Sequence, residues 1–363
     1  MIITSVEPIV LRIPFTDGSS GVGLFPAAWT HLDIVLVRIA TDAGLVGWGE
    51  GFGYFCATSV AAMVSGALAP LLTGREVGDP GALNEELQRR MVLPGRYGIS
   101  IFALSGVDIA LWDLRAKAQG VAACELLGKR LRRSVPAYAS LVRYGEADGV
   151  ARRAEQALTE GFRDLKLHEI TMPEIRRCRA VVGNEVPIAV DVNCNWSEAF
   201  TREATPELIA MKTRWLEEPV FPPEDFRLLA SLRTPMLPIA AGENACTAMQ
   251  FAEMIRHGAI DYLQPSVTKV GGISECEKIR ALNRSSGLPV APHSPYFGPG
   301  YLATLQLAAV DERFAIFEYL YIQPDDRLYR GFPLPERGKV PIPEGPGLGL
   351  EPDPEIIARY RVE

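Results

Sequence analysis

Hydrophobic and polar positions change their pattern twice along the chain. Residues 1–55 contain extended apolar runs, SVEPIVLRIPF and HLDIVLVRIATDAGLVGWGE, with the turn Asp42-Ala43-Gly44 inside the second. This pattern predicts antiparallel strands and a hairpin. Residues 56–128 instead carry apolar residues at helical spacing, as in SIFALSGVDIALWDLRAKAQG. Strands followed by a run of helices predict an α+β unit.

From about Val135 onward, apolar runs alternate strictly with helical patterns. The eight runs are VPAYASL, DLKLHEI, IAVDVN, RWLEEP, LPIAAGE, DYLQPSV, LPVAPHS and IFEYLY. Eight strands at near-constant spacing between helices predict a closed parallel β/α barrel. An open doubly wound sheet fits less well, because it usually has fewer strands and no glycine-rich phosphate turn opens the first helix. The tail, YRGFPLPERGKVPIPEGPGLGLEPD, is rich in Pro and Gly and is predicted to return to the N-terminal unit.

The composition is that of an ordinary packed protein and argues against several classes of function. Of 363 residues, 48% are hydrophobic and 22% charged, and the net charge is −7. Because there is no basic block, we expect no nucleic-acid partner. No apolar run approaches the roughly 20 residues of a membrane span, so we expect no membrane partner. The N-terminus lacks the plan of a signal peptide and the six cysteines are scattered, which together predict a cytoplasmic protein with free thiols.

Three acidic residues close three consecutive apolar runs of the barrel pattern. Asp191, Glu217 and Glu243 are equally spaced, 26 residues apart. A carboxylate at the end of a buried strand is costly unless a positive charge meets it. Three of them at corresponding places therefore predict a shared cation. All-oxygen ligation is typical of Mg²⁺, which keeps some of its waters and leaves room for a substrate.

Other polar residues follow the remaining strands, where β/α barrels place their working side chains. Lys166 and His168 alternate along the second strand, so both are expected to point into the barrel mouth. The sixth, seventh and eighth strands contribute Ser266 with Lys269, His293 and Glu318. A carboxylate triad between two groups of basic residues favours removal of a proton next to a carboxylate. The metal would hold the developing enediolate, and a Lys or His would take the proton.

In these motifs the chain resembles the enolase superfamily, in particular the mandelate racemase and muconate lactonizing enzyme family. GVDIALWDLRAKAQG with ELLGKR is similar to the segment that joins cap and barrel in that family. DLKLH resembles its Lys-x-Lys strand, DVNCNW its first metal strand, and WLEEP and GEN its second and third ligand motifs. KVGG resembles its sixth-strand loop and PGLGLEPD its tail. The motifs occur in order over nearly the whole chain, which makes the resemblance specific.

The resemblance implies an α/β fold, a modified (β/α)7β TIM barrel with an N-terminal α+β capping domain. We place the cap at residues 1–128, the barrel at 129–325 and a C-terminal segment that returns to the cap at 326–363. Loops of the cap choose the substrate in this family. The segments Gly18 to Trp29 and Gly51 to Tyr54 are therefore expected to cover the barrel mouth.

By position, the resemblance assigns Mg²⁺ to the triad, with Asn193 in support. Lys166 matches the first lysine of Lys-x-Lys, which positions the substrate carboxylate or tunes its neighbour. His168 stands where most members have the second lysine, the base on one face of the substrate. His293 resembles the seventh-strand histidine of the acid-sugar dehydratases, which works on the opposite face. Glu318 matches the eighth-strand glutamate that hydrogen-bonds the carboxylate as an acid.

The sixth strand departs from the family pattern. Racemase-like members place an Asp where this chain has Ser266, and lactonizing-enzyme-like members place a Lys base near there, whereas Lys269 aligns with a neighbouring lysine. A neutral serine stabilises an imidazolium less than a carboxylate does, so we expect His293 to be a weaker base than in the usual dyad. We interpret Ser266 as a hydrogen-bonding residue. We leave open whether Lys269 has a structural role in its loop or contacts the substrate.

The sequence therefore predicts a Mg²⁺-dependent enzyme that removes the α-proton of a small hydroxy-carboxylate, with dehydration of an acid sugar to a 2-keto-3-deoxy acid as the favoured outcome. Racemisation or epimerisation between His168 and His293 is the first alternative. A binding protein that kept the fold and lost catalysis is the second, although three buried carboxylates without a metal would be strongly destabilising. Substrate and stereochemistry stay open. A homo-oligomer is compatible with the family, whose members often assemble.

Overall fold

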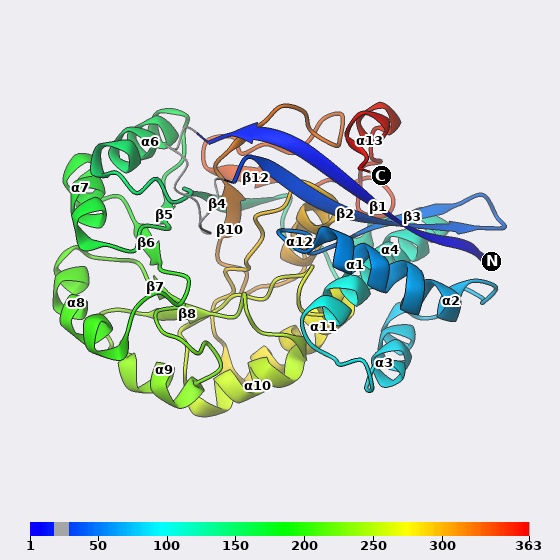
Figure 1. Cartoon of the computed structure of the whole chain (residues 1–363), viewed down its shortest axis with the longest axis horizontal. Helices are drawn as coiled ribbons and strands as arrows, with labels where there is room; N and C mark the ends of the chain where they lie inside the picture. Colours follow the sequence, from blue (N-terminus) through cyan, green and yellow to red (C-terminus); the bar gives the residue numbers. More distant parts are fainter. Residues whose placement is uncertain (18–28, 363) are drawn as a thin grey trace.

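The computed structural model describes residues 1–17 and 29–362, which fold into two parts (Figure 1). The beginning of the chain forms an antiparallel sheet with helices, and the middle forms a ring of strands surrounded by helices. The segment Gly18 to Trp29, which was expected to cover the barrel mouth, lies outside the described residues except for Trp29.

The N-terminal sheet has the strand order β11-β1-β2-β3. Strands β1 (Ile3–Thr16), β2 (His31–Thr41) and β3 (Val46–Gly51) pair antiparallel, and β11 (Gln323–Pro324) adds a short edge to β1. The turn between β2 and β3 places Gly44 at φ 77°, a conformation that glycine adopts without strain. The predicted hairpin is confirmed.

The N-terminal part also contains helices, several of which contact this sheet. The helices are α1 (Ala57–Met63), the π-helix η1 (Val64–Leu68), α2 (Ala69–Leu72), α3 (Pro80–Arg90), α4 (Ile99–Gln119) and α5 (Ala123–Leu127). Helix α4 lies directly on β3, because alternate positions of that strand are glycine. A Cβ on Gly49 would lie 1.9 Å from the carbonyl oxygen of Gly106 in α4. Larger residues in β3 would therefore push the helix away from the sheet.

The barrel strands run parallel in the order of the sequence, and the pairing of the last with the first closes the ring. They are β4 (Ser134–Ser140), β5 (Leu165–Leu167), β6 (Ile188–Asp191), β7 (Leu216–Glu217), β8 (Ile239–Ala241), β9 (Tyr262–Leu263) and β10 (Phe317–Leu320). The helices around the ring (Figure 1) are α6 (Ala147–Thr159), α7 (Met172–Val182), α8 (Glu198–Ala210), α9 (Phe226–Leu232), α10 (Thr247–His257), α11 (Gly272–Ser286) and α12 (Pro299–Ala308). The predicted β/α barrel with an N-terminal cap is confirmed. Within residues 1–17 and 29–362, none of the helices combines the length and apolar character that crossing a bilayer requires.

The seventh predicted strand, LPVAPHS, is reduced to a single bridging residue. Val290 pairs with Leu263 on one side and with Phe314 on the other, so the ring still closes. Pro289 and Pro292 lie on either side of Val290, and proline has no amide hydrogen to donate to a ladder. The apolar pattern therefore predicted a longer strand than the backbone donors of this segment can support.

Side chains fill the floor of the barrel. A separate buried cluster consists of Tyr138, Ala189, Trp215, Ala240, Ala291 and Ile316. Ala189 precedes Asp191 by two positions and Trp215 precedes Glu217 likewise, so each pair faces the same side of its strand. The apolar floor and the acidic strand ends are thus successive layers of the barrel interior.

The C-terminal segment contacts both parts of the molecule. Strand β12 (Lys339–Pro341) pairs antiparallel with β4 of the barrel. Helix α13 (Pro354–Tyr360) lies against β1 of the cap, where Leu11 bridges to Arg361. The domain boundaries after residues 128 and 325 stay a prediction.

Glu50 connects the cap to the barrel. It lies in β3 and is buried, and its Oε2 accepts a hydrogen bond of 2.7 Å from the amide of Gly300 in α12. Burial raises the pKa of Glu50 to about 8, although the amides of Gly300 and Gly298 act in the opposite direction. A Cβ on Gly298 would lie 2.6 Å from the same oxygen, so this loop approaches the cap closely. The contact between the two parts therefore includes a carboxyl group that holds its proton at neutral pH.

We predict that Glu50→Gln makes the stability of the protein less sensitive to pH. The folded protein keeps this proton up to about pH 8, whereas the unfolded chain releases it near the ordinary value of 4.5. The free energy of unfolding of the native protein therefore falls between these two pH values, and the variant lacks this contribution of at most about 5 kcal/mol. Denaturant unfolding at several pH values measures the difference, with Glu185→Gln, an exposed carboxylate, as the control. Equal pH dependence of Glu50→Gln and the native protein would contradict the assignment.

Candidate active site

Three carboxylates converge at the carboxyl end of the barrel. Asp191 and Glu217 are the last residues of β6 and β7 and lie opposite one another in the ladder. Glu243 follows β8 by two residues. One oxygen of each lies within 4.8 Å of the others, and all three residues are buried. The fold thus brings together the three residues that the sequence predicted as metal ligands.

This donor set fits a hard divalent cation. It consists of carboxylate oxygens only, the ligands that Mg²⁺ prefers. Oδ2 of Asp191 and Oδ1 of Asn193 are buried and make no hydrogen bond of good geometry, so both can accept a further ligand. The backbone amide of Asn193 donates to Oδ1 of Asp191 at 2.9 Å and orients that carboxylate. The buried triad can hold a metal ion, with Asn193 beside it.

Lys166 compensates part of the negative charge. Its Nζ lies 2.7 Å from Oε1 of Glu217, 2.9 Å from Oε1 of Glu318 and 3.3 Å from Oδ2 of Asp191. Burial alone would lower the pKa of Lys166, but these carboxylates raise it well above its usual value. Burial raises the pKa of Glu217, and the charge of Asp191 raises it further. One ammonium group faces more carboxylates than it can neutralise, and a divalent cation would complete the balance.

His168 lies just beyond β5, two residues after Lys166. Nδ1 of its ring lies 2.5 Å from the carbonyl oxygen of Leu141, which can only accept, so Nδ1 carries the proton. Nε2 lies 3.3 Å from Oδ2 of Asp191 and is the nitrogen without a proton whenever the ring is uncharged. Lys166 and His168 therefore both face the triad, as their alternation along the strand predicted. An imidazole with a free Nε2 is a suitable proton acceptor.

His293 approaches the triad from the seventh position of the barrel. Its Nε2 lies 3.2 Å from Oε2 of Glu243. Its Nδ1 lies 3.2 Å from both Oγ of Ser266 and the hydroxyl of Tyr296. Burial lowers the pKa of His293 to about 3, so the ring is neutral. Each hydroxyl can donate or accept, so the pair holds the ring without fixing which nitrogen carries the proton.

Tyr296 is a candidate functional residue that the sequence did not reveal. Its hydroxyl makes a short contact with Oγ of Ser266, and its ring lies nearly perpendicular to that of His293 at a centroid distance of 5.9 Å. Burial raises the pKa of Tyr296 well above its usual value, so the hydroxyl keeps its proton. Two neutral hydroxyls thus occupy the place where the resemblance to racemase-like members implied a carboxylate. The sequence offered one indication that Tyr296 belongs to the site, namely that it follows His293 by three positions.

Two further side chains orient the carboxylates. Trp215 is buried in the core, and its Nε1 also donates to Oε2 of Glu217 at 2.8 Å. Glu318 accepts from Oγ of Ser140 at 2.7 Å and from the amide of Ser294 at 2.8 Å. Burial alone would raise the pKa of Glu318, but the charge of Lys166 keeps it below its ordinary value. Glu318 is therefore ionised, and its role as an acid toward a substrate stays a prediction.

A cavity of about 370 Å³ lies between these strand ends and the cap. The barrel contributes polar residues, among them His168, Asn193, Glu243, Lys269, His293 and Glu318. The cap contributes the aromatic residues Trp29, Phe52, Tyr54 and Phe55. The segment Gly51 to Tyr54 therefore covers the mouth as expected. The volume is in the range of small-molecule sites.

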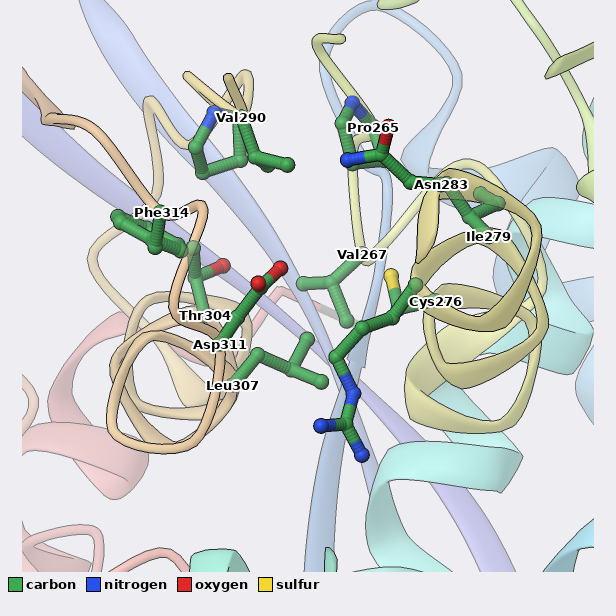
Figure 2. A pocket seen from close by; sticks show the side chains of 12 residues that line it. Pro265, Val267, Cys276, Ile279, Asn283, Val290, Thr304, Leu307, Asp311 and Phe314 are labelled. Atoms are coloured by element: carbon green, nitrogen blue, oxygen red, sulfur yellow. The ribbon is translucent and has the colours of Figure 1, made fainter. Parts of the chain in front are cut away.

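A separate and smaller cavity lies between the barrel wall and helices α11 and α12 (Figure 2). Its volume is about 40 Å³, and its walls include Val267, Ile279 and Leu307. A space of this size holds a few water molecules at most. The cavity under the cap is therefore the candidate active site.

Two family models match the chain. The mandelate racemase / muconate lactonizing enzyme N-terminal domain matches residues 27–128. The enolase C-terminal domain-like model matches residues 149–356. The protein therefore belongs to the mandelate racemase and muconate lactonizing enzyme family of the enolase superfamily, a family of enzymes, and the resemblance seen in the sequence motifs is confirmed.

Known relatives align with almost the whole chain. A D-galactonate dehydratase of Verminephrobacter eiseniae (strain EF01-2) is 31% identical over 92% of this chain and 91% of its own. A D-galactarolactone cycloisomerase of Agrobacterium fabrum (strain C58) is 31% identical over 90% of this chain and 91% of its own. The crystal structure of an L-talarate dehydratase from Polaromonas sp. JS666, complexed with Mg and L-glucarate, has a TM-score of 0.84 and 27% identity, covering 100% of this chain and 98% of that one. A solved neighbour thus contains Mg, and the buried triad of this chain has the ligands for it.

We predict that Mg²⁺ raises the unfolding temperature of the metal-free protein through the triad. An ion that binds only the folded state stabilises it by about 2.7 kcal/mol at a hundredfold excess over its Kd. Glu243→Gln removes one ligand charge and should weaken this response. Glu275→Gln, a buried carboxylate of α11 that binds Gln88 and Lys278 instead, is the control and should keep it. Calorimetry measures both, and an equal Mg²⁺ response in the two variants would contradict the assignment.

Proposed function

We propose that the protein removes the α-proton of an acid sugar and eliminates water to give a 2-keto-3-deoxy acid. One observation carries the proposal: two imidazole rings contact the same carboxylate triad from different strands, His168 at Asp191 and His293 at Glu243. A substrate at the triad would have a proton acceptor and a proton donor at hand. The galactonate dehydratase and talarate dehydratase among the relatives support this choice.

His168 is the base in this proposal. Because its Nδ1–H is held by the carbonyl of Leu141, Nε2 is the nitrogen that takes the proton from the α-carbon. Lys166 stays protonated beside it and offers positive charge to the substrate carboxylate. A Mg²⁺ ion at the triad would stabilise the negative charge that this carboxylate gains.

His293 is the acid. The β-hydroxyl leaves with its bonding electrons, takes a proton from Nε2 of His293 and departs as water. The enol that remains takes a proton at the β-carbon and becomes the 2-keto-3-deoxy acid. An anionic substrate raises the pKa of the neighbouring ring, which lets His293 carry the proton. In that state the hydroxyls of Ser266 and Tyr296 accept from Nδ1.

Racemisation or epimerisation is the second candidate, and the same two rings support it. Two imidazoles on different strands can exchange protons with one α-carbon from two faces. The partners of His293 are neutral, however, and they support the imidazolium that a two-base racemase needs less well than a carboxylate would. Dehydration is therefore the favoured reaction.

We further propose that the protein acts in the cytoplasm on a small carboxylate, without a nucleic-acid or membrane partner. All six cysteines are free, which suits a reducing compartment. The net charge of −7 disfavours binding to nucleic acid. Assembly into a homo-oligomer is a further prediction, supported by the frequent assembly of members of the family.

We predict that NMR in D₂O distinguishes dehydration from racemisation or epimerisation, and the role of His168 from that of His293. The Mg²⁺-loaded protein should exchange the α-hydrogen of an acid sugar and remove a hydroxyl. His168→Asn should slow both steps by about 10²–10⁴, whereas His293→Asn should slow loss of the hydroxyl and leave exchange in place. His257→Asn, at the end of α10, is the control.

Two results would change this account. Exchange with inversion and without loss of the hydroxyl would identify a racemase or epimerase. Full turnover by His168→Asn would show that another residue is the base.

We predict that Tyr296→Phe lowers kcat by about fivefold and changes KM little. The lost hydroxyl is one of two hydrogen-bond partners of Nδ1 of His293, and a hydrogen bond of this kind contributes about 1 kcal/mol. Tyr301→Phe is the matched control, because it removes a buried hydroxyl that binds the carbonyl of Pro333 instead. Steady-state kinetics compare the two, and an equal loss in both would show that Tyr296 has no special role in the site.

A further inference from the structure

Lys269 is a buried cation on the side of the candidate cavity that faces the cap. It lies in the loop after β9 and is only 8% exposed. Its Nζ lies 3.3 Å from Oδ1 of Asn244. The same atom lies 4.9 Å from the ring centroid of Phe52 and 5.9 Å from that of Phe102, both residues of the cap.

Among the residues that the structure describes, this ammonium group has no carboxylate in ion-pair contact. Within residues 1–17 and 29–362, no carboxylate oxygen lies within 4.0 Å of Nζ of Lys269, whereas Nζ of Lys166 has three. Glu218 interacts with it electrostatically from beyond that distance. One amide oxygen and two aromatic faces stabilise a buried ammonium group only in part. The side chain is therefore suited to bind an anion.

The ammonium group borders open space although the residue is buried. Lys269 and Asn244 line the cavity of about 370 Å³ that contains the triad side chain Glu243. The same two residues line a neighbouring cavity of about 300 Å³, which Tyr97 and Glu218 also border. Because Glu243 and Lys269 line the same cavity of about 370 Å³, a ligand held at the triad can extend toward Lys269.

We propose that Lys269 binds a second carboxylate at the far end of the substrate, so that the substrate is a diacid. The inference rests on the proposed function, because it takes the first carboxylate to be held at the triad. Lys166 does not serve the second carboxylate, since its charge is shared among three carboxylates of the barrel. One ammonium group with an amide beside it matches a single monovalent anion.

This charge also provides a basis for specificity. A sugar acid with one carboxylate ends in a neutral hydroxyl, which would leave the buried charge of Lys269 without a counter-ion. A diacid neutralises that charge, and the difference favours the diacid without any further contact. The cavity therefore selects by charge at one end and by reactivity at the other.

Kinetics with matched pairs of substrates test the inference. Aldaric acids, which have two carboxylates, are compared with aldonic acids of the same hydroxyl configuration. The native protein should prefer the diacid. Lys269→Met, which keeps the apolar stem of the side chain, should lower kcat/KM for the diacid by at least about 30-fold and for the monoacid by less than about threefold. Lys212→Met, an exposed lysine just before β7, controls for the change in net charge.

The other outcomes distinguish a failure of this inference about Lys269 from a failure of the proposed function. A native protein that prefers the monoacid or treats both alike overturns the inference, as does a Lys269→Met variant that loses the same factor on both substrates. Failure to exchange the α-hydrogen of either class overturns the proposed function instead. In that case, calorimetric binding of the same pairs still decides the role of Lys269. Tighter binding of the diacid that disappears in Lys269→Met supports it, and equal binding of both acids overturns it.

Discussion

The burial of three carboxylates at one end of a barrel is the constraint on which the rest of the structure depends. Asp191, Glu217 and Glu243 approach one another within the protein interior, where water cannot separate their charges. Lys166 supplies one positive charge among them, and a divalent cation would supply two more. The cap covers the same place and strengthens each of these interactions by excluding water. Reactivity toward a carboxylate substrate follows from this concentration of charge.

Much of this arrangement could be predicted from the sequence because it follows from periodicity. Equal intervals between Asp191, Glu217 and Glu243 place them at corresponding points of successive β/α units. Alternation along one strand was enough to place Lys166 and His168 on one face, and both contact Asp191. Regular structure repeats itself, so a repeat in the sequence reports on it directly.

The remaining features could not be predicted, because they depend on contacts between residues far apart in the sequence. Tyr296 meets Ser266 across 30 positions, and no local pattern relates the two. The indole of Trp215 lies in the core and also donates to Glu217 from the layer below, which its apolar surroundings in the sequence do not indicate. The seventh strand was overestimated, because apolar spacing does not register the amide hydrogens that proline lacks. In each case a specific hydrogen bond, and not hydrophobic periodicity, decides the outcome.

The two buried lysines show how the same residue type can serve opposite purposes. Lys166 contacts three carboxylates of the barrel, whereas Lys269 contacts an amide oxygen beneath the aromatic rings of the cap. The account of the site depends on the metal at the triad, and a crystal structure of the protein soaked with Mn²⁺ as a substitute for Mg²⁺ tests this most directly. We predict an anomalous density peak within about 2.5 Å of oxygens of Asp191, Glu217 and Glu243. The absence of a peak there across a series of increasing Mn²⁺ concentrations would contradict the account.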